Sequence, residues 1–325
     1  MSPPRKAQED KQFLERLKTS LRRNGIFLIL LLLFILSSVF VRGFFSPVNL
    51  TNVLRQITVV TIIALGATFV IILGHINVAY GSCVALIGCL TCKIMVLSAS
   101  LPLALLAGLA LGLFIGAVNG TVITWFRIPA FIMTLAITTI ARGAVLLFTG
   151  ARPITGMNPE FKFIGQGSLG FIPVSVLIMI VLFAVSWILL NKTAFGRHLF
   201  ATGGNEYAAT ASGVKTKSVV RMAFLFDGFM MAIAGIVMMS RLNSGQPASG
   251  VGYEFDAITA VVVGGTSLAG GSGSIVGTII GAVIVGILNN CLNLLSVNTY
   301  VQQITKGVII LIAVIVDVLS KRIRR

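Results

Sequence analysis

The sequence predicts an all-α membrane protein that crosses the bilayer with about ten transmembrane helices. Hydrophobic residues make up 56% of the chain and charged residues only 10%. An ordinary soluble domain carries roughly 25% charged residues. Long apolar runs recur along the whole chain, and they lack the period-two alternation of barrel strands. Since lipid offers backbone groups no hydrogen-bond partner, such runs must cross the bilayer as helices.

Each predicted span is an apolar run close to the length of about 20 residues that crosses the hydrocarbon core of a membrane. The basic segment 1–25 precedes the first span, and residues 26–320 form the transmembrane domain. A signal peptide is the alternative for the first run, but its n-region would be unusually long and no small-residue cleavage site follows it. The predicted spans are 26–42, 52–73, 82–98, 101–124, 131–149, 173–190, 218–240, 256–270, 274–295 and 301–319.

Basic residues occur in blocks outside the apolar runs, as is typical of cytoplasmic loops. The blocks run from Arg5 to Arg23, from Lys192 to Arg221 and from Lys321 to Arg325. With the N-terminus inside, ten crossings put the polar loop 191–217 and the basic tail 321–325 in the cytoplasm, and the segments 150–172 and 241–255 outside. The net charge of +16 is therefore explained by membrane orientation, and nucleic acid is not expected as a partner.

The linker 150–172 divides the spans into two sets of five, and an odd number per set gives two halves of opposite orientation, as in an inverted repeat. Both sets contain a glycine-interrupted apolar segment, at 73–82 and at 263–271. Paired interruptions of this kind point to the translocation path of a transporter. Close packing of helices through small residues explains them equally well, so both interpretations stay open.

The sequence offers no device by which the chain could energise transport by itself. No GxxxxGK[ST] motif occurs, so the chain does not cradle ATP phosphates in that way. Asp227 lies inside the seventh span, whereas Asp256 and Asp317 lie near span ends, and an ion-coupled carrier usually has more intramembrane acids. This favours Asp227 as a buried polar group satisfied by a neighbouring helix over a proton relay. The two histidines and four cysteines form no metal or catalytic constellation, so no cofactor is expected.

The polar loop has the character of a docking surface for a cytoplasmic partner, and a plain solvated connector is the alternative. We expect a short helix in it that opens with Asn205 as N-cap and ends near Gly213. The residues of the loop expected to couple to an ATPase are Gly196, Arg197, Gly203, Gly204, Asn205, Glu206, Ala208, Ala209 and Gly213.

Several motifs, in order, closely resemble the ribose-type monosaccharide ABC permease family. They are FGR at 195–197, GGNE at 203–206, SRLNSGQP at 240–247, GYEFDAI at 252–258, GGTSLAGG at 264–271, GILNN at 286–290 and QQ at 302–303. The resemblance implies a homodimer of permease subunits in the bacterial inner membrane, with an ATP-binding subunit on the cytoplasmic face and a periplasmic sugar-binding protein. The polar loop would then receive the ATPase movement and transmit it to the helices.

The chain departs from the family at residues 74–82. Where the family commonly reads GGIDLSVGS, this sequence reads GHINVAYGS. Asn77 replaces an acidic residue of the family pattern, Ala79 replaces a serine and His75 replaces a glycine. The charge and bulk of this turn are therefore altered.

We expect the membrane-spanning permease subunit of an ATP-driven importer of a monosaccharide, a ribose-like pentose or a hexose. The rival is a self-sufficient secondary carrier, which would take up sugar without any partner chain. Amide side chains suit neutral sugar hydroxyls, although each one could instead serve as an interhelical hydrogen bond. The candidates for the translocation path are Asn77, Asn119, Gln246, Asn289 and Asn290.

Overall fold

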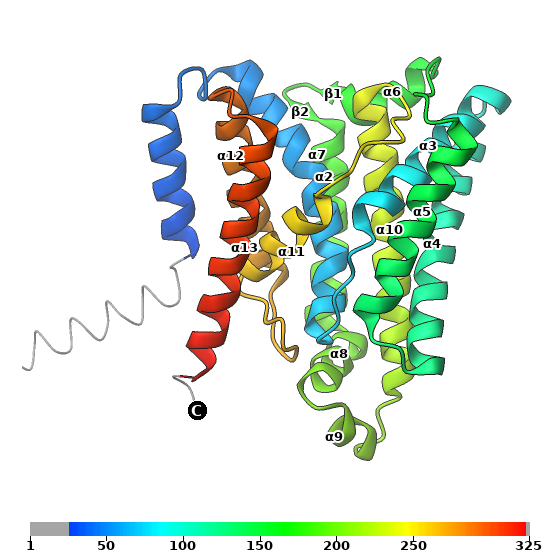
Figure 1. Cartoon of the computed structure of the whole chain (residues 1–325), viewed down its shortest axis with the longest axis vertical. Coiled ribbons are helices and arrows are strands. Elements are labelled where there is room, and N and C mark those ends of the chain that lie inside the picture. The colour runs from blue at the N-terminus through cyan, green and yellow to red at the C-terminus, as the bar shows by residue number, and fades with distance from the viewer. Residues whose placement is uncertain (1–25, 323–325) are drawn as a thin grey trace, which may run out of the picture.

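The computed structural model describes residues 26–322, which form an upright bundle of helices (Figure 1). Within that range, seven helices are long and apolar enough to cross a membrane. They are α2 (Pro47–Ile72), α3 (Tyr80–Ser98), α4 (Leu101–Phe126), α5 (Ala130–Thr149), α7 (Val174–Lys192), α10 (Thr216–Leu242) and α12 (Ile275–Leu294). The prediction of an all-α polytopic membrane protein is confirmed.

Three further helices coincide with predicted spans but are not among these seven. They are the short apolar helix Ile26–Phe40, α11 (Tyr253–Val263) and α13 (Thr299–Arg322). The predicted number of about ten transmembrane helices is therefore not confirmed. The basic segment 1–25 and residues 323–325 of the basic tail lie outside the described residues.

The predicted span 256–270 differs most from the structure. The helix there, α11, has 11 residues, which rise only about 16 Å and cannot cross a bilayer. A glycine in the left-handed region stands at each end, Gly252 with φ 87° and Gly265 with φ 88°. Glycine adopts this conformation at little cost, so the apolar run is interrupted on both sides of a short helix.

The two long helices α2 and α10 form the centre of the bundle. They pack against each other, α10 also packs on α3 and α4, and α2 also packs on α12. The contact between α4 and α10 is made through glycines: a Cβ atom at Gly112 would lie 2.6 Å from the carbonyl oxygen of Gly228. Small residues let two main chains approach closely, which is how helices commonly associate in lipid.

The two ends of the bundle carry different short elements (Figure 1). One end, called here the α6 end, carries the helix α6 (Pro159–Gln166) and the antiparallel strands β1 (Ser168–Leu169) and β2 (Ile172–Pro173). The opposite end, called the α9 end, carries α8 (Ala194–Gly204) and α9 (Glu206–Ala211). The end of α13 lies on the same side as α9.

Candidate coupling segment and polar sites

The polar loop folds into α8 and α9, each with a capped start. The hydroxyl of Thr193 accepts a hydrogen bond of 3.3 Å from the N–H of Gly196 at the beginning of α8. The side-chain oxygen of Asn205 accepts one of 3.0 Å from the N–H of Ala208 in α9. Gly213 follows the end of α9 with φ 84°. The predicted N-cap at Asn205 and the predicted end near Gly213 are confirmed.

Close main-chain contacts join α8 to the transmembrane helices. Gly203 packs on the carbonyl of Ile72 at the end of α2, and a Cβ at Gly203 would lie 2.9 Å from the nitrogen of Gly271. The N–H of Gly271 donates to the same Ile72 carbonyl at 2.8 Å. Gly196 packs in the same way on the carbonyl of Leu190 in α7. Because these main chains touch, a displacement of α8 must also displace Ile72 and Gly271.

The outer face of α9 is exposed. Tyr207 is 91% exposed, whereas Ala209 on the inner face is buried. A protruding helix that is anchored on one side and open on the other has the geometry of a docking element. The exposed members of the predicted coupling set are Arg197, Gly204, Asn205, Glu206, Ala208 and Gly213.

A cavity of about 720 Å³ lies between α9, the turn that joins α4 to α5, and the start of α10. His75 reaches this cavity from the non-helical segment between α2 and α3. Burial lowers the pKa of His75, and the nearby Glu206 carboxylate opposes that shift, so the imidazole is neutral near pH 7. The other polar residues that line the cavity are Thr124, Arg127, Glu206, Tyr207, Thr210, Thr216 and Lys217.

Asn77 links the break after α2 to α10. Its Nδ2 donates to Oδ2 of Asp227 at 2.7 Å, and its Oδ1 accepts from the N–H of Ala79 at 2.9 Å. Both side chains are buried, and a Cβ at Gly66 would lie 2.6 Å from Oδ1 of Asp227. The expectation that a neighbouring helix satisfies Asp227 is met only in part: the non-helical segment with Asn77 satisfies Oδ2, whereas Oδ1 of Asp227 has no hydrogen-bond partner among the described residues.

Asn119 and Gln246 differ in how their amides are used. Asn119 is fully buried in α4, and its side-chain nitrogen and oxygen have no hydrogen-bond partner among the described residues. Gln246 lies in the segment after α10 and donates from Nε2 to the hydroxyl of Ser244 at 3.0 Å. Asn119 thus keeps a free amide, whereas Gln246 makes a local turn contact.

Asn290 forms a reciprocal amide pair with Asn49. Nδ2 of Asn290 donates to Oδ1 of Asn49 at 2.9 Å, and Nδ2 of Asn49 donates to Oδ1 of Asn290 at 3.1 Å. Nδ2 of Asn49 also donates to the carbonyl of Phe44 at 2.9 Å. These bonds tie α12 to the start of α2, which is the interhelical role given as the alternative for Asn290.

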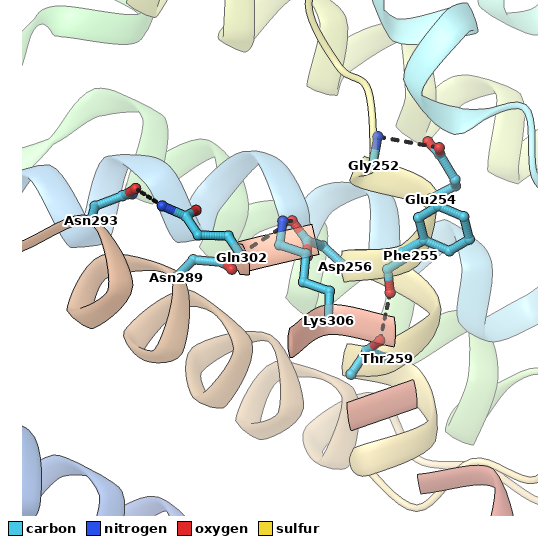
Figure 2. A network of polar contacts seen from close by, with 9 residues as sticks. All are labelled: Gly252, Glu254, Phe255, Asp256, Thr259, Asn289, Asn293, Gln302 and Lys306. Carbon is cyan, nitrogen blue, oxygen red and sulfur yellow. Dashed lines mark hydrogen bonds and ion pairs between the residues drawn. The ribbon is translucent and has the colours of Figure 1, made fainter. Parts of the chain in front are cut away.

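Asn289 belongs to a partly buried charged network that joins three helices (Figure 2). Nζ of Lys306 in α13 lies 2.9 Å from Oδ2 of Asp256 in α11, and the two side chains are 26% and 4% exposed. Nδ2 of Asn289 in α12 donates to the same carboxylate oxygen at 3.3 Å. Sequence reasoning missed Lys306. A lysine inside the last predicted span is the signal that could have found it, because an intramembrane charge requires a partner.

The two segments predicted to lie outside form one surface at the α6 end. The N–H of Ile154 donates to the carbonyl of Gly245 at 2.9 Å, and the N–H of Gly245 donates back at 2.8 Å. Nε2 of Gln166 donates to the carbonyl of Arg241 at 2.8 Å. The turn between β1 and β2 presents a fully exposed Phe171. Segments about 90 residues apart in the sequence therefore build a single surface with an apolar tip.

Comparison with known proteins gives matches over nearly the whole chain. The family model described as branched-chain amino acid transport system / permease component matches residues 49–314. The ribose import permease protein RbsC of Bacillus subtilis (strain 168) is 44% identical over 299 residues, 91% of this chain and 93% of that relative. The RbsC protein of Haemophilus influenzae is 42% identical over 295 residues, 90% of this chain and 91% of the relative.

A relative with another cargo in its name also matches. The D-allose transport system permease protein AlsC of Escherichia coli (strain K12) is 33% identical over 297 residues, 91% of this chain and 91% of the relative. No solved structure matches the chain.

Proposed function

This chain belongs to the family described as the branched-chain amino acid transport system permease component, and we propose that it is the membrane-spanning subunit of an ATP-driven monosaccharide importer. The observation that carries the proposal is the 44% identity to a ribose import permease over 91% of the chain. Relatives named for ribose and for D-allose support a pentose or a hexose as the class of cargo. The chain is a transport subunit, and ATP hydrolysis belongs to a separate partner.

In this proposal the ATP-binding subunit docks on α8 and α9. The exposed residues of α9, among them Glu206 and Tyr207 at the border of the cavity, are available to a partner. The main-chain junction of Gly203 with Ile72 and Gly271 gives a direct route from that surface to α2 and to the glycine-rich segment before α12. Movement of the partner would therefore reach two membrane segments at once.

The α9 end then faces the cytoplasm, together with both chain termini. The basic blocks of the sequence support this orientation. Aromatic side chains also support a membrane interface at this end: Trp125 and Phe126 are exposed beside Arg127, and Nζ of Lys192 lies 5.3 Å from the ring centroid of Trp187. The periplasmic sugar-binding protein docks on the surface at the α6 end, where Phe171 is exposed.

We also propose that the two halves of the bundle form an inverted repeat, and that two copies of the chain assemble as a homodimer. The packing supports the repeat, because the contact of α4 with α10 has its counterpart in the contact of α12 with α2. Likewise α3 packs on α4 and α5, while α11 packs on α12 and α13. The helices α2 and α10 end at opposite ends of the bundle, and each is followed by a non-helical segment (Figure 1).

For the translocation path, Asn119 is the strongest of the five proposed amides. Its side chain has no hydrogen-bond partner among the described residues, so its donor and acceptor can both serve a sugar hydroxyl. The amide of Asn290 is already engaged with Asn49, and that of Asn77 with Asp227. Sugar contacts by these two would require the existing bonds to open.

The proposal is tested by purifying the chain from native membranes in mild detergent and identifying the co-purifying chains. We expect an ATP-binding subunit that is lost in Glu206→Lys, because the reversal changes the charge of the exposed first turn of α9. Glu160→Lys is the matched control, since it reverses an exposed charge in the first turn of α6 at the other end. Loss of the partner in both variants would contradict docking on α9.

A second measurement separates the importer from the secondary carrier. The purified complex in liposomes should take up a pentose or a hexose only when ATP and the binding protein are supplied. Uptake by this chain alone, driven by an ion gradient, would establish the carrier instead.

A further inference from the structure

We propose that the 720 Å³ cavity at the α9 end binds a small, hydroxyl-bearing phosphate ester from the cytoplasm. The proposal assigns a ligand class to a site distinct from the sugar path, and its regulatory part rests on the proposed function. The size of the cavity falls within the range of about 300–1,000 Å³ that small-molecule sites occupy.

The walls of the cavity come from four separate parts of the chain. His75 comes from the break after α2, Arg127 from the turn after α4, Glu206 and Tyr207 from α9, and Lys217 from the first turn of α10. Segments that are distant in sequence thus meet around one volume. A ligand that contacts them all would hold α9 against the bundle.

The cations around the cavity suit a phosphate group. Arg127 and Lys217 line it, and neither makes an ion pair within the described part of the chain. A third cation stands next to the wall, because Nε of Arg221 donates to the hydroxyl of Thr124 at 2.8 Å. With a neutral His75 and a single carboxylate, Glu206, the site carries a net positive charge. Arginine and lysine together form charge-assisted hydrogen bonds to phosphate oxygens.

The remaining lining residues suit hydroxyl groups on the same ligand. The carboxylate of Glu206 accepts hydrogen bonds from hydroxyls. The hydroxyls of Thr210 and Thr124 donate to main-chain carbonyls and can still accept from a ligand. The neutral imidazole of His75 also offers one donor and one acceptor. A bare phosphate would leave these groups unused, so a phosphate ester of a sugar-like molecule fits better.

A lipid headgroup carries the same phosphate chemistry and is close at hand. Trp125 and Phe126, exposed immediately before Arg127, mark the level of the membrane interface. The soluble ester is favoured because the cavity also borders α9, which stands beyond the ends of the transmembrane helices (Figure 1). The experiment below separates the two sources.

The functional consequence follows from what the ligand would bridge. α9 is the proposed docking helix, and the ligand would link it to the turn after α4. The relative motion of these elements, which coupling needs, would be restrained. An internal phosphate ester would therefore slow import, as an end-product signal.

Binding is tested on the full chain in nanodiscs by isothermal titration calorimetry, with ribose 5-phosphate as the probe. We expect ribose 5-phosphate to bind at least about tenfold more tightly than ribose or inorganic phosphate, since the probe alone offers both kinds of group. Lys217→Gln and Arg127→Gln should each weaken its binding about tenfold. Lys215→Gln, an exposed residue that does not line the cavity, is the matched control and should change it less than about twofold.

The nanodiscs are prepared with phosphatidylcholine alone and with added phosphatidylglycerol. Equal binding of the probe in both lipids supports a soluble ligand. Absence of binding in phosphatidylcholine, equal weakening by Lys215→Gln, or association of phosphatidylglycerol alone with the Lys217 site overturns the proposal.

The regulatory part is tested by adding the probe to the cytoplasmic side of the reconstituted importer. We expect slower ATP-driven uptake in the wild type and no slowing in Lys217→Gln. Uptake that is insensitive to a bound probe overturns regulation. Failure of the importer assignment is recognised separately, because the calorimetry needs neither ATP nor a partner chain.

Discussion

The contact between α4 and α10 and the contact between α11 and α13 hold helices together by different means. In the first, main chains touch through glycines such as Gly112 and Gly228. In the second, the Lys306–Asp256 ion pair of 2.9 Å joins the helices through side chains. Both contacts belong to a protein surrounded by lipid, where apolar contact alone gives little driving force for helix association.

The difference suggests which part of the molecule moves as a unit. Glycine contacts depend on close fit along a whole helix face, so α4 and α10 must shift together. An ion pair concentrates its contribution in two side chains, and its loss leaves a buried charge. We therefore expect α4 and α10 to act as one rigid body and α13 to be the more separable element.

The largest effect is expected for Gly112→Leu. The added leucine side chain would meet the main chain of α10, so the two helices must separate. We expect the free energy of unfolding to fall by more than about 4 kcal/mol. Folded protein should be lost in fluorescence-detected size-exclusion chromatography. Gly143→Leu on α5 is the control, because nothing lies within 4 Å of a Cβ built there. Equal yields of the two variants would break the comparison.

A smaller but still severe effect is expected for Lys306→Met. It leaves the Asp256 carboxylate buried without its cation, which costs about 3 kcal/mol. The measurement is thermal unfolding in detergent. The double variant Asp256→Asn with Lys306→Met should recover most of the loss, since no unpaired charge remains. A double variant as unstable as Lys306→Met would show that packing of the lysine stem, rather than charge, dominates.

Asp227 is the second buried carboxylate, and it tests whether a buried acid in this bundle needs a cation as partner. Asp227 accepts a hydrogen bond of 2.7 Å from an amide, and within residues 26–322 it makes no ion pair. Asp227→Asn keeps the shape and the acceptor, so we expect a change of less than about 1 kcal/mol in the same unfolding assay. If it proves as destabilising as Lys306→Met, then the carboxylate charge itself is needed beside Asn77.

The smallest global effect is expected for Asn205→Ala. It removes the cap of α9 and costs about 1 kcal/mol locally. Because α9 projects from the bundle, the unfolding temperature should stay unchanged while amide exchange at Ala208 accelerates severalfold. Ser212→Ala is the control on the same segment, since its hydroxyl donates to a carbonyl at 2.9 Å and caps no amide. A global loss of stability would show that α9 is part of the core.

Hydropathy predicted the helices because length and apolarity are local properties of the sequence. The cap at Asn205 was also predictable, since a cap involves residues only three positions apart. The prediction of residues 256–270 as one continuous transmembrane helix was wrong. The glycines of this segment were visible in the sequence. Glycines in an apolar run, however, are equally compatible with a closely packed helix and with an interrupted one.

The polar pairs were beyond single-sequence reasoning. Asn77 and Asp227 lie 150 positions apart, and Lys306 and Asp256 lie 50 apart. No local rule links residues at these separations, because they meet only through tertiary packing. The cavity at the α9 end was equally hidden, since its lining comes from four separate parts of the chain.

The junction of Gly203, Ile72 and Gly271 bears on how such a transporter can diversify. The bond from Gly271 to Ile72 uses only main-chain atoms, so no side chain there encodes the identity of the partner. In the proposed assembly, the residues that select the partner lie on the exposed surface of α9, away from the junction. Under the proposed function, related transporters can therefore change their ATP-binding subunit while they keep the same main-chain junction.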